Sequence, residues 1–311
     1  MGWSSTLPPA ASARLRQPPV PRGGGVIPRE AWKIWPEVTP QPQDIRRTKT
    51  GEFIVELPLV SYVLVAVDTA FSERETADFS ACVVLGVWER RREEVSRATP
   101  WMAERWGSPD PHEALARSEE GSDQPRVCLM EGWVTRAGLN DMTLSPVTQK
   151  PVGLVPRLLD TCRRRQAHRI ILENANRGKD TADELRRQMY SHEFDVELVD
   201  PTGSKLARMH SVSPLFSAGL VYSPANLIRV LDKDGRETVD VREFAWVAEI
   251  ASQCLRTPRG KQDLADCVSM GLQWLRNAGM LELQHEFIKS ELERRAWKPK
   301  PLNVGQLYGV A

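Results

Sequence analysis

The chain has 311 residues, and its 42 Lys and Arg residues almost balance its 41 Asp and Glu residues, so the formal net charge at pH 7 is +1. This balance excludes nucleic-acid binding through a globally basic surface, and any such surface must come from local segregation of charge. Apolar residues make up 41% and charged residues 27% of the sequence, which is typical of a globular protein and excludes a disordered or fibrous chain.

The five cysteines are widely spaced among apolar residues, and the five histidines show no ligand spacing. This pattern predicts buried thiols in a reducing compartment, and it favours neither a disulfide framework nor a zinc site. No apolar stretch is long enough to span a membrane, and the N-terminus lacks the apolar core of a signal peptide. We therefore expect a cytoplasmic protein without a membrane partner.

Residues 1–52 are predicted to form an irregular N-terminal arm or linker, because the first 28 or so are rich in Pro, Ser, Ala and Gly. Within this arm, Arg29 to Pro36 carries Trp32 and Trp35 and is expected to dock as a short helix on the main domain. The glycines at 23–25 are not followed by Gly-Lys-Ser/Thr, and no Walker A motif occurs elsewhere. We expect no unaided ATP hydrolysis by this chain.

Three strands are predicted at the start of a regular domain over residues 53–278. The apolar run from Tyr62 to Val67 has no polar alternation, which is typical of a strand buried on both faces, and it ends at Asp68. Further strands are predicted over Phe79 to Trp88 and Arg126 to Val134, with a charged insertion at about 89–124 between them. The connections favour an antiparallel meander.

Helices and strands then alternate. Helical spacing from Val152 to Cys162 is followed by a predicted strand from His168 to Glu173. A capping box at Thr181 opens a predicted helix that runs through Met189. A strand from Phe194 to Leu198 and a helix from Ser204 to Ser217 follow. A short strand is then predicted at Leu220 to Tyr222. It is followed by a hairpin whose strands, Leu227–Leu231 and Thr238–Val241, are joined by a turn at Asp232 to Gly235. The domain ends with two helices, whose apolar faces run from Val247 to Cys254 and from Leu264 to Leu275. This order predicts an α/β fold of the ribonuclease H-like arrangement, a mixed sheet with helices on both faces.

Acidic residues end two of the predicted strands, at Asp68 and Glu173, and two more lie on a later helix, at Asp263 and Asp266. If the two strands are neighbours, Asp68 and Glu173 project into one cleft, and the helix brings Asp263 and Asp266 over them on one helical face. We expect the carboxylates of Asp68, Glu173 and Asp263 within a few ångströms of one another. Hard oxygen ligands favour Mg²⁺ or Mn²⁺, and two such ions would support phosphodiester cleavage.

Structural roles remain open for each of these acids. Asp68 alone is typical of a residue that opens a turn. Asp263 suits a helix N-cap, and Asp266 suits the first turn because of the helix dipole. Asp78, directly before a predicted strand, is interpreted as a turn residue.

Four basic residues are candidates for contact with a phosphate backbone, namely Arg177, Lys179, Lys205 and Arg208. The first two directly follow Glu173, and the other two open the helix after the strand that ends at Leu198, so all four would lie at one sheet edge. The alternative for each is a solvated surface charge.

Five motifs carry a resemblance to the nuclease domain of tailed-bacteriophage terminase large subunits. They are Val67-Asp68-Thr69-Ala70 with Asp78-Phe-Ser80, Ile170-Ile-Leu-Glu173-Asn-Ala-Asn-Arg-Gly178, Gly203-Ser-Lys205-Leu-Ala-Arg208, Phe216-Ser-Ala-Gly219-Leu-Val-Tyr-Ser-Pro224, and Trp246 through Gln253-Cys254 into Gln262-Asp263-Leu-Ala-Asp266-Cys-Val-Ser-Met270. The similarity covers roughly residues 20–278, and the motifs occur in the family's order.

The resemblance implies a metal-dependent endonuclease that cuts concatemeric double-stranded viral DNA during packaging. It assigns metal binding to Asp68, Glu173 and Asp263, with Asp266 as a helper, and it implies two Mg²⁺ or Mn²⁺ ions. The partners it implies are double-stranded DNA, a packaging ATPase domain or subunit, the portal protein and the small terminase subunit. The implied location is the host cytoplasm.

The sequence departs from the family at two places. Gln262 stands where the family usually has an acid, so the second metal is expected to be held more weakly. The family's motor ATPase is missing before this domain, although Arg14 to Gly25 resembles the junction that follows it. A truncation, a late start and one half of a split gene all fit this pattern.

Two other functions fit the same residues. One is a junction-resolving or transposase-like nuclease of the same fold, and the other is a non-cleaving module that binds DNA or docks on the portal. The last segment, 279–311, is predicted to hold an amphipathic helix over 280–297 and a tail. This helix either packs on its own domain or, by the resemblance, contacts the portal.

Overall fold

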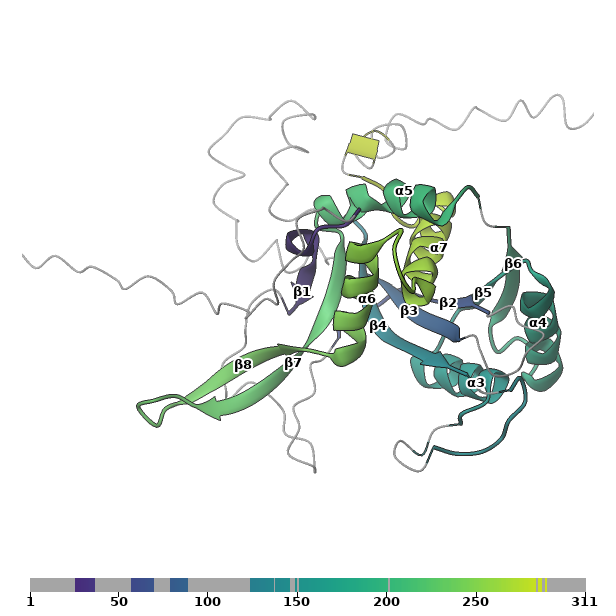
Figure 1. The fold of residues 1–311 in the computed structure, drawn as a ribbon, viewed down its shortest axis with the longest axis horizontal. Helices are drawn as coiled ribbons and strands as arrows, with labels where there is room; N and C mark the ends of the chain where they lie inside the picture. The colour runs from purple at the N-terminus through teal and green to yellow at the C-terminus, as the bar shows by residue number, and fades with distance from the viewer. Residues whose placement is uncertain are drawn as a thin grey trace, which may run out of the picture.

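An eight-stranded mixed sheet forms the centre of the chain in the computed structural model. The structure describes residues 26–36, 57–69, 79–88, 124–136, 138–145, 149, 151–200, 202–283, 285–286 and 289. The strands are β1 Lys33–Trp35, β2 Tyr62–Asp68, β3 Ser80–Trp88, β4 Arg126–Thr135, β5 Arg169–Glu173, β6 Asp195–Val199, β7 Val221–Leu231 and β8 Glu237–Glu243. They are arranged in the order β1-β7-β4-β3-β2-β5-β6, and β8 pairs with β7 (Figure 1).

The directions of the strands define the fold. β2, β3 and β4 form the predicted antiparallel meander, whereas β5 lies parallel to β2 and β6 lies parallel to β5. The order β4-β3-β2-β5-β6 with these directions is the ribonuclease H-like topology, and the α/β prediction is confirmed. The predicted adjacency of the strands that end at Asp68 and Glu173 is confirmed too.

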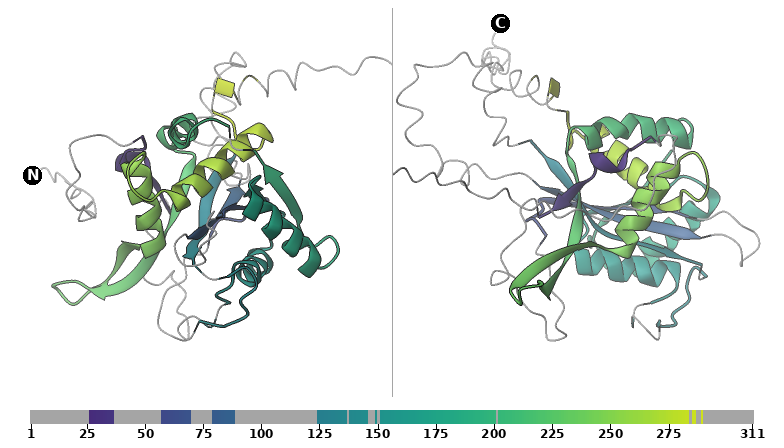
Figure 2. Two further views of the ribbon diagram at one scale, coloured as in Figure 1. Left: turned by 45° about the vertical axis from the view of Figure 1, so that its right-hand side comes forward. Right: turned by 60° about the vertical axis from the view of Figure 1, so that its left-hand side comes forward.

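Helices cover both faces of the sheet (Figures 1 and 2). On one face lie α5 Lys205–Ser217, α6 Ala245–Arg256 and α7 Asp263–Asn277, and on the other lie α3 Leu154–Arg165 and α4 Asn176–Gln188. Along β2, Leu64 and Ala66 join the core under α5, α6 and α7, while Val63, Val65 and Val67 join the core of α3 and α4. Because both faces are buried, β2 is apolar throughout and shows no alternation of polarity.

One glycine lets α7 lie close to the sheet. A Cβ on Gly271 would be 2.2 Å from Leu85 Cδ1 and 3.3 Å from the Cβ of Ala66. With any larger side chain here, either Leu85 or α7, which packs against β2 and β3, would have to move. The small residue therefore sets the distance between the sheet and the helix that carries Asp263 and Asp266.

Part of the predicted N-terminal arm joins the core. The expected short helix over Arg29 to Pro36 is instead the three-residue 3-10 turn η1 Arg29–Ala31 followed by β1, which pairs in parallel with β7. The edge of the sheet offers backbone hydrogen bonds to this segment, and Trp35 packs against Trp88 with 5.0 Å between the ring centroids. Pairing at the sheet edge therefore decides the conformation of this segment, and Ile34 and Trp35 suit a strand.

Two other elements of the structure differ from the predicted ones. The helix expected from Thr181 is α4, which begins at Asn176, and the hydroxyl of Thr181 donates to the carbonyl of Arg177 inside the helix instead of capping it. The two strands expected on either side of residue 224 are one strand, β7, because its first part pairs with β1 and β4 and its second part with β8. The β7–β8 ribbon extends away from the rest of the sheet (Figure 1).

All five cysteines are buried free thiols, as predicted. No helix in the described ranges is long and apolar enough to cross a membrane. The expected insertion at 89–124 and Asp78 lie outside the described residues, apart from Gln124. Most of the predicted helix at 280–297 also lies outside, although Leu281 is buried and Glu286 pairs with Arg276 at 2.7 Å. The domain boundaries stay a prediction.

Candidate metal centre

Asp68 and Glu173 end two neighbouring parallel strands and face the same side of the sheet. Val67 of β2 is paired with Leu172 of β5, so the two acids occupy the next position on each strand. Ile171 lies in the core under α5, α6 and α7, as does Ala66. Because side chains alternate along a strand, Glu173 and Asp68 point to this same face.

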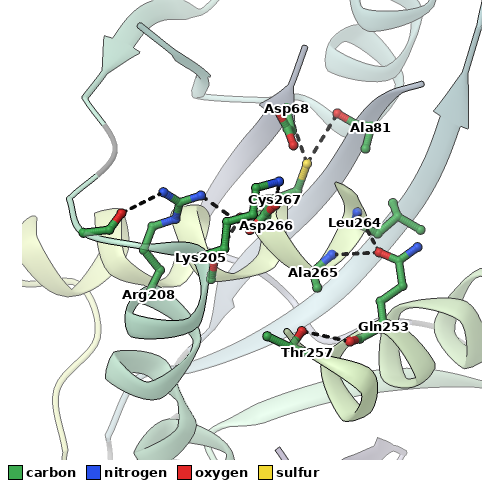
Figure 3. Close-up of polar contacts among 12 residues, drawn as sticks. Asp68, Ala81, Lys205, Arg208, Gln253, Thr257, Leu264, Ala265, Asp266 and Cys267 are labelled. Carbon is green, nitrogen blue, oxygen red and sulfur yellow. Dashed lines mark hydrogen bonds and ion pairs between the residues drawn. The ribbon is translucent and has the colours of Figure 1, made fainter. Parts of the chain in front are cut away.

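The thiol of Cys267 ties α7 to the end of β2. The backbone N–H of Asp68 donates to Cys267 Sγ at 3.2 Å, and the thiol donates to the carbonyl of Ala81 at 3.4 Å (Figure 3). Asp68 and Ala81 are themselves cross-strand partners. Cys267 follows Asp266 directly, so this contact brings the first turns of α7 over the end of the strand.

A small cavity of about 70 Å³ opens at this place, and its walls include Asp68, Glu173 and Asp266. Arg208 of α5 and Asp200, which directly follows β6, also line it. Asp263 is not part of the cavity wall, although its charge acts on Asp68. Three of the four predicted acids therefore share one cavity, and the fourth lies within electrostatic range.

Two cations from α5 hold Asp266. Lys205 Nζ forms an ion pair with Asp266 Oδ2, and Arg208 Nη2 lies 3.4 Å from Asp266 Oδ1. The side chains of Asp266 and Arg208 are only 6% and 9% exposed, whereas that of Lys205 is 52% exposed. Although burial lowers the pKa of Lys205, the hydrogen bond to Asp266 and the nearby charges of Asp68 and Asp263 raise it overall.

Burial and neighbouring acids raise the pKa of Asp68 to about 7, against an ordinary value of 3.8. Desolvation has the largest effect, the charge of Lys205 opposes it, and Asp266, Glu173 and Asp263 add to it. One ammonium group therefore does not fully compensate the acids at this sheet edge. A site with surplus carboxylate charge is suited to a divalent cation.

The predicted ligands do not form a closed cluster. In the part of the chain that the structure describes, no group of three or more His, Cys, Asp or Glu side chains is placed to hold a metal ion. The expectation that the carboxylates of Asp68, Glu173 and Asp263 lie within a few ångströms of one another stays a prediction. In this structure Lys205 and Arg208 bind Asp266, and Asp263 lies outside the cavity wall.

The available donors nevertheless fit a hard divalent ion. Asp68 and Glu173 supply carboxylate oxygens on one face, and Mg²⁺ commonly binds through one or two carboxylates while it keeps several waters. Lys205, which binds Asp266, has a half-exposed side chain. The roles of Asp68, Glu173, Asp263 and Asp266 as ligands stay predictions.

The predicted phosphate-contacting residues differ in their surroundings. Lys179 is exposed and Arg177 is half-buried, both near the start of α4. Gly178 between them packs against the end of β5, where an added Cβ would lie 1.9 Å from the carbonyl oxygen of Glu173. Arg208 is buried against Asp266 and forms part of the cavity wall. Contact with DNA stays a prediction for all four cations.

Sequence reasoning assigned no role to three residues of this region, Asp200, Cys267 and Gln253. Asp200 follows β6 as Asp68 and Glu173 end their strands, so the rule that ends of parallel strands meet at one edge could have found it. Asn174 Nδ2 donates to Asp200 Oδ1 at 2.7 Å. Cys267 and Gln253 make contacts between elements, and their spacing in the sequence gives no sign of them.

The chain is similar to two solved structures of the large terminase nuclease from the thermophilic phage G20c. The structure with bound magnesium has a TM-score of 0.37 and 11% sequence identity. The structure with bound cobalt has a TM-score of 0.35 and 14% identity. Each comparison covers 81% of this chain and 98% of the other. No protein-family model and no curated protein sequence matches the chain.

Proposed function

We propose that this chain is a divalent-metal-dependent DNA endonuclease that hydrolyses phosphodiester bonds of double-stranded DNA. One observation carries the proposal: two adjacent parallel strands end in acids on the face that is covered by a helix with two more acids in its first turns. The raised pKa of Asp68 supports it, because the acids outnumber the cations at this edge. Perturbed carboxylates in a cavity are candidates for a functional site.

In this mechanism Asp68 and Glu173 would hold the metal through carboxylate oxygens, and Asp263 and Asp266 would complete the site from α7. Two Mg²⁺ or Mn²⁺ ions would activate a water molecule and stabilise the leaving oxygen. Lys205 must release Asp266 before Asp266 can act as a ligand. The released ammonium group, with Lys179 and Arg177, would then contact the DNA phosphates.

The biological setting that we propose is genome packaging by a viral terminase. The motifs of the sequence support this setting. In it, the chain acts with a packaging ATPase domain or subunit, the small terminase subunit and the portal protein, in the cytoplasm of a host cell. The neighbouring upstream reading frame provides a direct check, because a Walker A ATPase there would identify a split gene.

Plasmid cleavage tests the activity. We expect nicking or cutting of supercoiled duplex DNA with Mg²⁺ or Mn²⁺, with little sequence preference and at a higher rate with Mn²⁺. Manganese tolerates an imperfect ligand set better than magnesium does, and Gln262 stands where the related motif has an acid. Asp68→Asn should abolish cleavage, because it removes an anionic ligand without changing the shape of the side chain.

Glu131→Gln is the matched control for this experiment, since Glu131 is a largely buried carboxylate of the same sheet outside the cavity wall. It should cleave at the wild-type rate per folded molecule. Equal cleavage by wild type and Asp68→Asn would overturn the proposal. DNA binding without cleavage under any divalent ion would favour the non-cleaving module instead.

A further inference from the structure

The N-terminus of α7 receives its cap from another helix. Gln262 is at the N-cap position with φ −136° and ψ 7°, and its side chain makes no capping hydrogen bond. Instead, Gln253 Oε1 of α6 accepts hydrogen bonds from the backbone N–H groups of Leu264 at 3.0 Å and Ala265 at 3.2 Å (Figure 3). These are two of the first N–H groups of α7, which have no partner inside their own helix.

The amide of Gln253 is itself fixed in orientation. Its Nε2 donates to Glu249 Oε1 at 3.0 Å, so Oε1 must face α7. Its backbone carbonyl accepts a hydrogen bond from the hydroxyl of Thr257 at 2.9 Å. The residue is only 5% exposed. A buried amide with its donor and acceptor both engaged holds a defined geometry.

The two N–H groups that Gln253 binds lie between Asp263 and Asp266 in the sequence. We infer that Gln253 is a positioning residue of the proposed metal centre, which fixes the first turn of α7 and thereby the directions of Asp263 and Asp266. The inference rests on the proposed function. Gln253 acts through the backbone, because its hydrogen bonds are with Leu264, Ala265, Glu249 and Thr257 and with neither of the two acids.

An amide suits this place better than the usual charged cap. Asp or Glu at an N-cap is favourable in an isolated helix because of its dipole. Here the first turns of α7 already carry two acids, and their charges act on Asp68 as well. A neutral carbonyl oxygen accepts the two N–H groups without adding another negative charge to the centre.

Manganese binding to the purified, metal-free chain tests the inference by isothermal titration calorimetry. Gln253→Leu removes the acceptor at similar volume, and we expect Mn²⁺ affinity to fall about 10- to 100-fold, as for other outer-shell partners of metal sites. Hydrogen exchange of the Leu264 and Ala265 amides should accelerate in the same variant. Thr257→Val is the matched control, because it removes a hydrogen bond of Gln253 that does not reach α7, and its Mn²⁺ affinity should equal that of wild type.

A double variant separates positioning from general stability. Glu249→Gln combined with Gln253→Glu exchanges donor and acceptor at constant net charge, so the new amide donates to the new carboxylate, which still accepts from Leu264 and Ala265. We expect Mn²⁺ affinity no more than about threefold below that of wild type, because the acceptor is kept and the negative charge moved toward α7 attracts the cation. This comparison tests the inference even where Gln253→Leu does not fold. Low affinity in the folded double variant, or equal losses in Gln253→Leu and Thr257→Val, would overturn the inference.

Asp68→Asn distinguishes this outcome from failure of the proposed function. If wild type and Asp68→Asn bind Mn²⁺ equally, the proposed centre is wrong. If Asp68→Asn loses binding while folded Gln253→Leu binds as wild type does, the centre stands and only the role of Gln253 is wrong.

Discussion

Asp68 and Glu131 are both largely buried carboxylates of the central sheet, yet their pKa values are shifted in opposite directions. Asp68 lies on the side of α7 among other acids, with Lys205 as the opposing charge, and its pKa is raised to about 7. Glu131 of β4 lies on the side of α3. Burial alone would raise its pKa, but hydrogen bonds from Arg164 and Arg165 lower it to about 2.

The difference separates a structural acid from a candidate functional one. Glu131 Oε2 has guanidinium nitrogens of Arg164 and Arg165 at 3.1 Å and 2.9 Å, so the protein supplies its own counter-charge. At the end of β2 the acids outnumber the cations, and a cation from solution can supply what is missing. Burial alone therefore does not point to a site, whereas burial with incomplete compensation of charge marks a candidate for one.

The pH dependence of stability should show the largest contrast. The folded-state pKa of Asp68 is raised from 3.8, so the metal-free folded chain binds more protons than the unfolded chain between about pH 4 and 7, and its stability falls as pH rises. Between pH 5 and pH 8 the titration of Asp68 should lower the free energy of unfolding by roughly 3 kcal/mol. Urea unfolding in the presence of a chelator should show this loss in wild type, and Asp68→Asn should remove it. A slope that persists in Asp68→Asn would assign the titration to another group.

Removing the structural acid should have the next largest effect. Glu131→Gln breaks charged hydrogen bonds to Arg164 and Arg165, and we expect a loss of about 2–3 kcal/mol at pH 7. Because the pKa of Glu131 is lowered from 4.5 to about 2, its stabilisation is present above pH 4.5 and disappears as pH falls toward 2. Urea midpoints at pH 7 and pH 3 measure this change, and equal stability of variant and wild type at pH 7 would contradict it.

Gly178 of α4 lies directly against the backbone carbonyl of Glu173. Gly178→Ala would place a Cβ 1.9 Å from the Glu173 carbonyl oxygen, so α4 or the end of β5 must move, at a cost of about 1–3 kcal/mol. Gly138→Ala is the control, since nothing lies within 4 Å of its added Cβ. We expect reduced stability and weaker Mn²⁺ binding only for Gly178→Ala. Similar results for both variants would show that this close approach does not position Glu173.

Lys205→Met should have the smallest effect on stability, less than about 1 kcal/mol, because the lysine side chain is half-exposed. Its effect on DNA should be larger. If the ammonium group contacts a phosphate, the variant should bind duplex DNA more weakly by a similar factor for all sequences. The slope of the logarithm of the binding constant against the logarithm of the salt concentration should also become smaller by about one. Fluorescence anisotropy at several salt concentrations measures both, with Lys179→Met in parallel. Unchanged DNA affinity would limit Lys205 to its ion pair with Asp266.

The sequence alone determined the antiparallel meander, the neighbouring parallel strand and the two strand-end acids. Uninterrupted apolar runs such as Tyr62 to Val67 identify strands buried on both faces, and alternation of side chains fixes the face of the residue that ends each run. The order of elements then implies that the strands ending at Asp68 and Glu173 are neighbours. These features are local or periodic, so a single sequence is enough to read them.

Only the tertiary structure decided which charges meet. β1 pairs in parallel with β7 at the edge of the sheet, and no periodic pattern in the sequence indicated this pairing. Asp266 is bound to Lys205 and Arg208 from another helix, Cys267 joins α7 to β2, and Gln253 caps a helix that begins ten residues later. Contacts of this kind depend on distances and orientations of a few ångströms between elements far apart in the chain. Such distances leave no periodic trace in a sequence, because packing sets them only after the elements have formed.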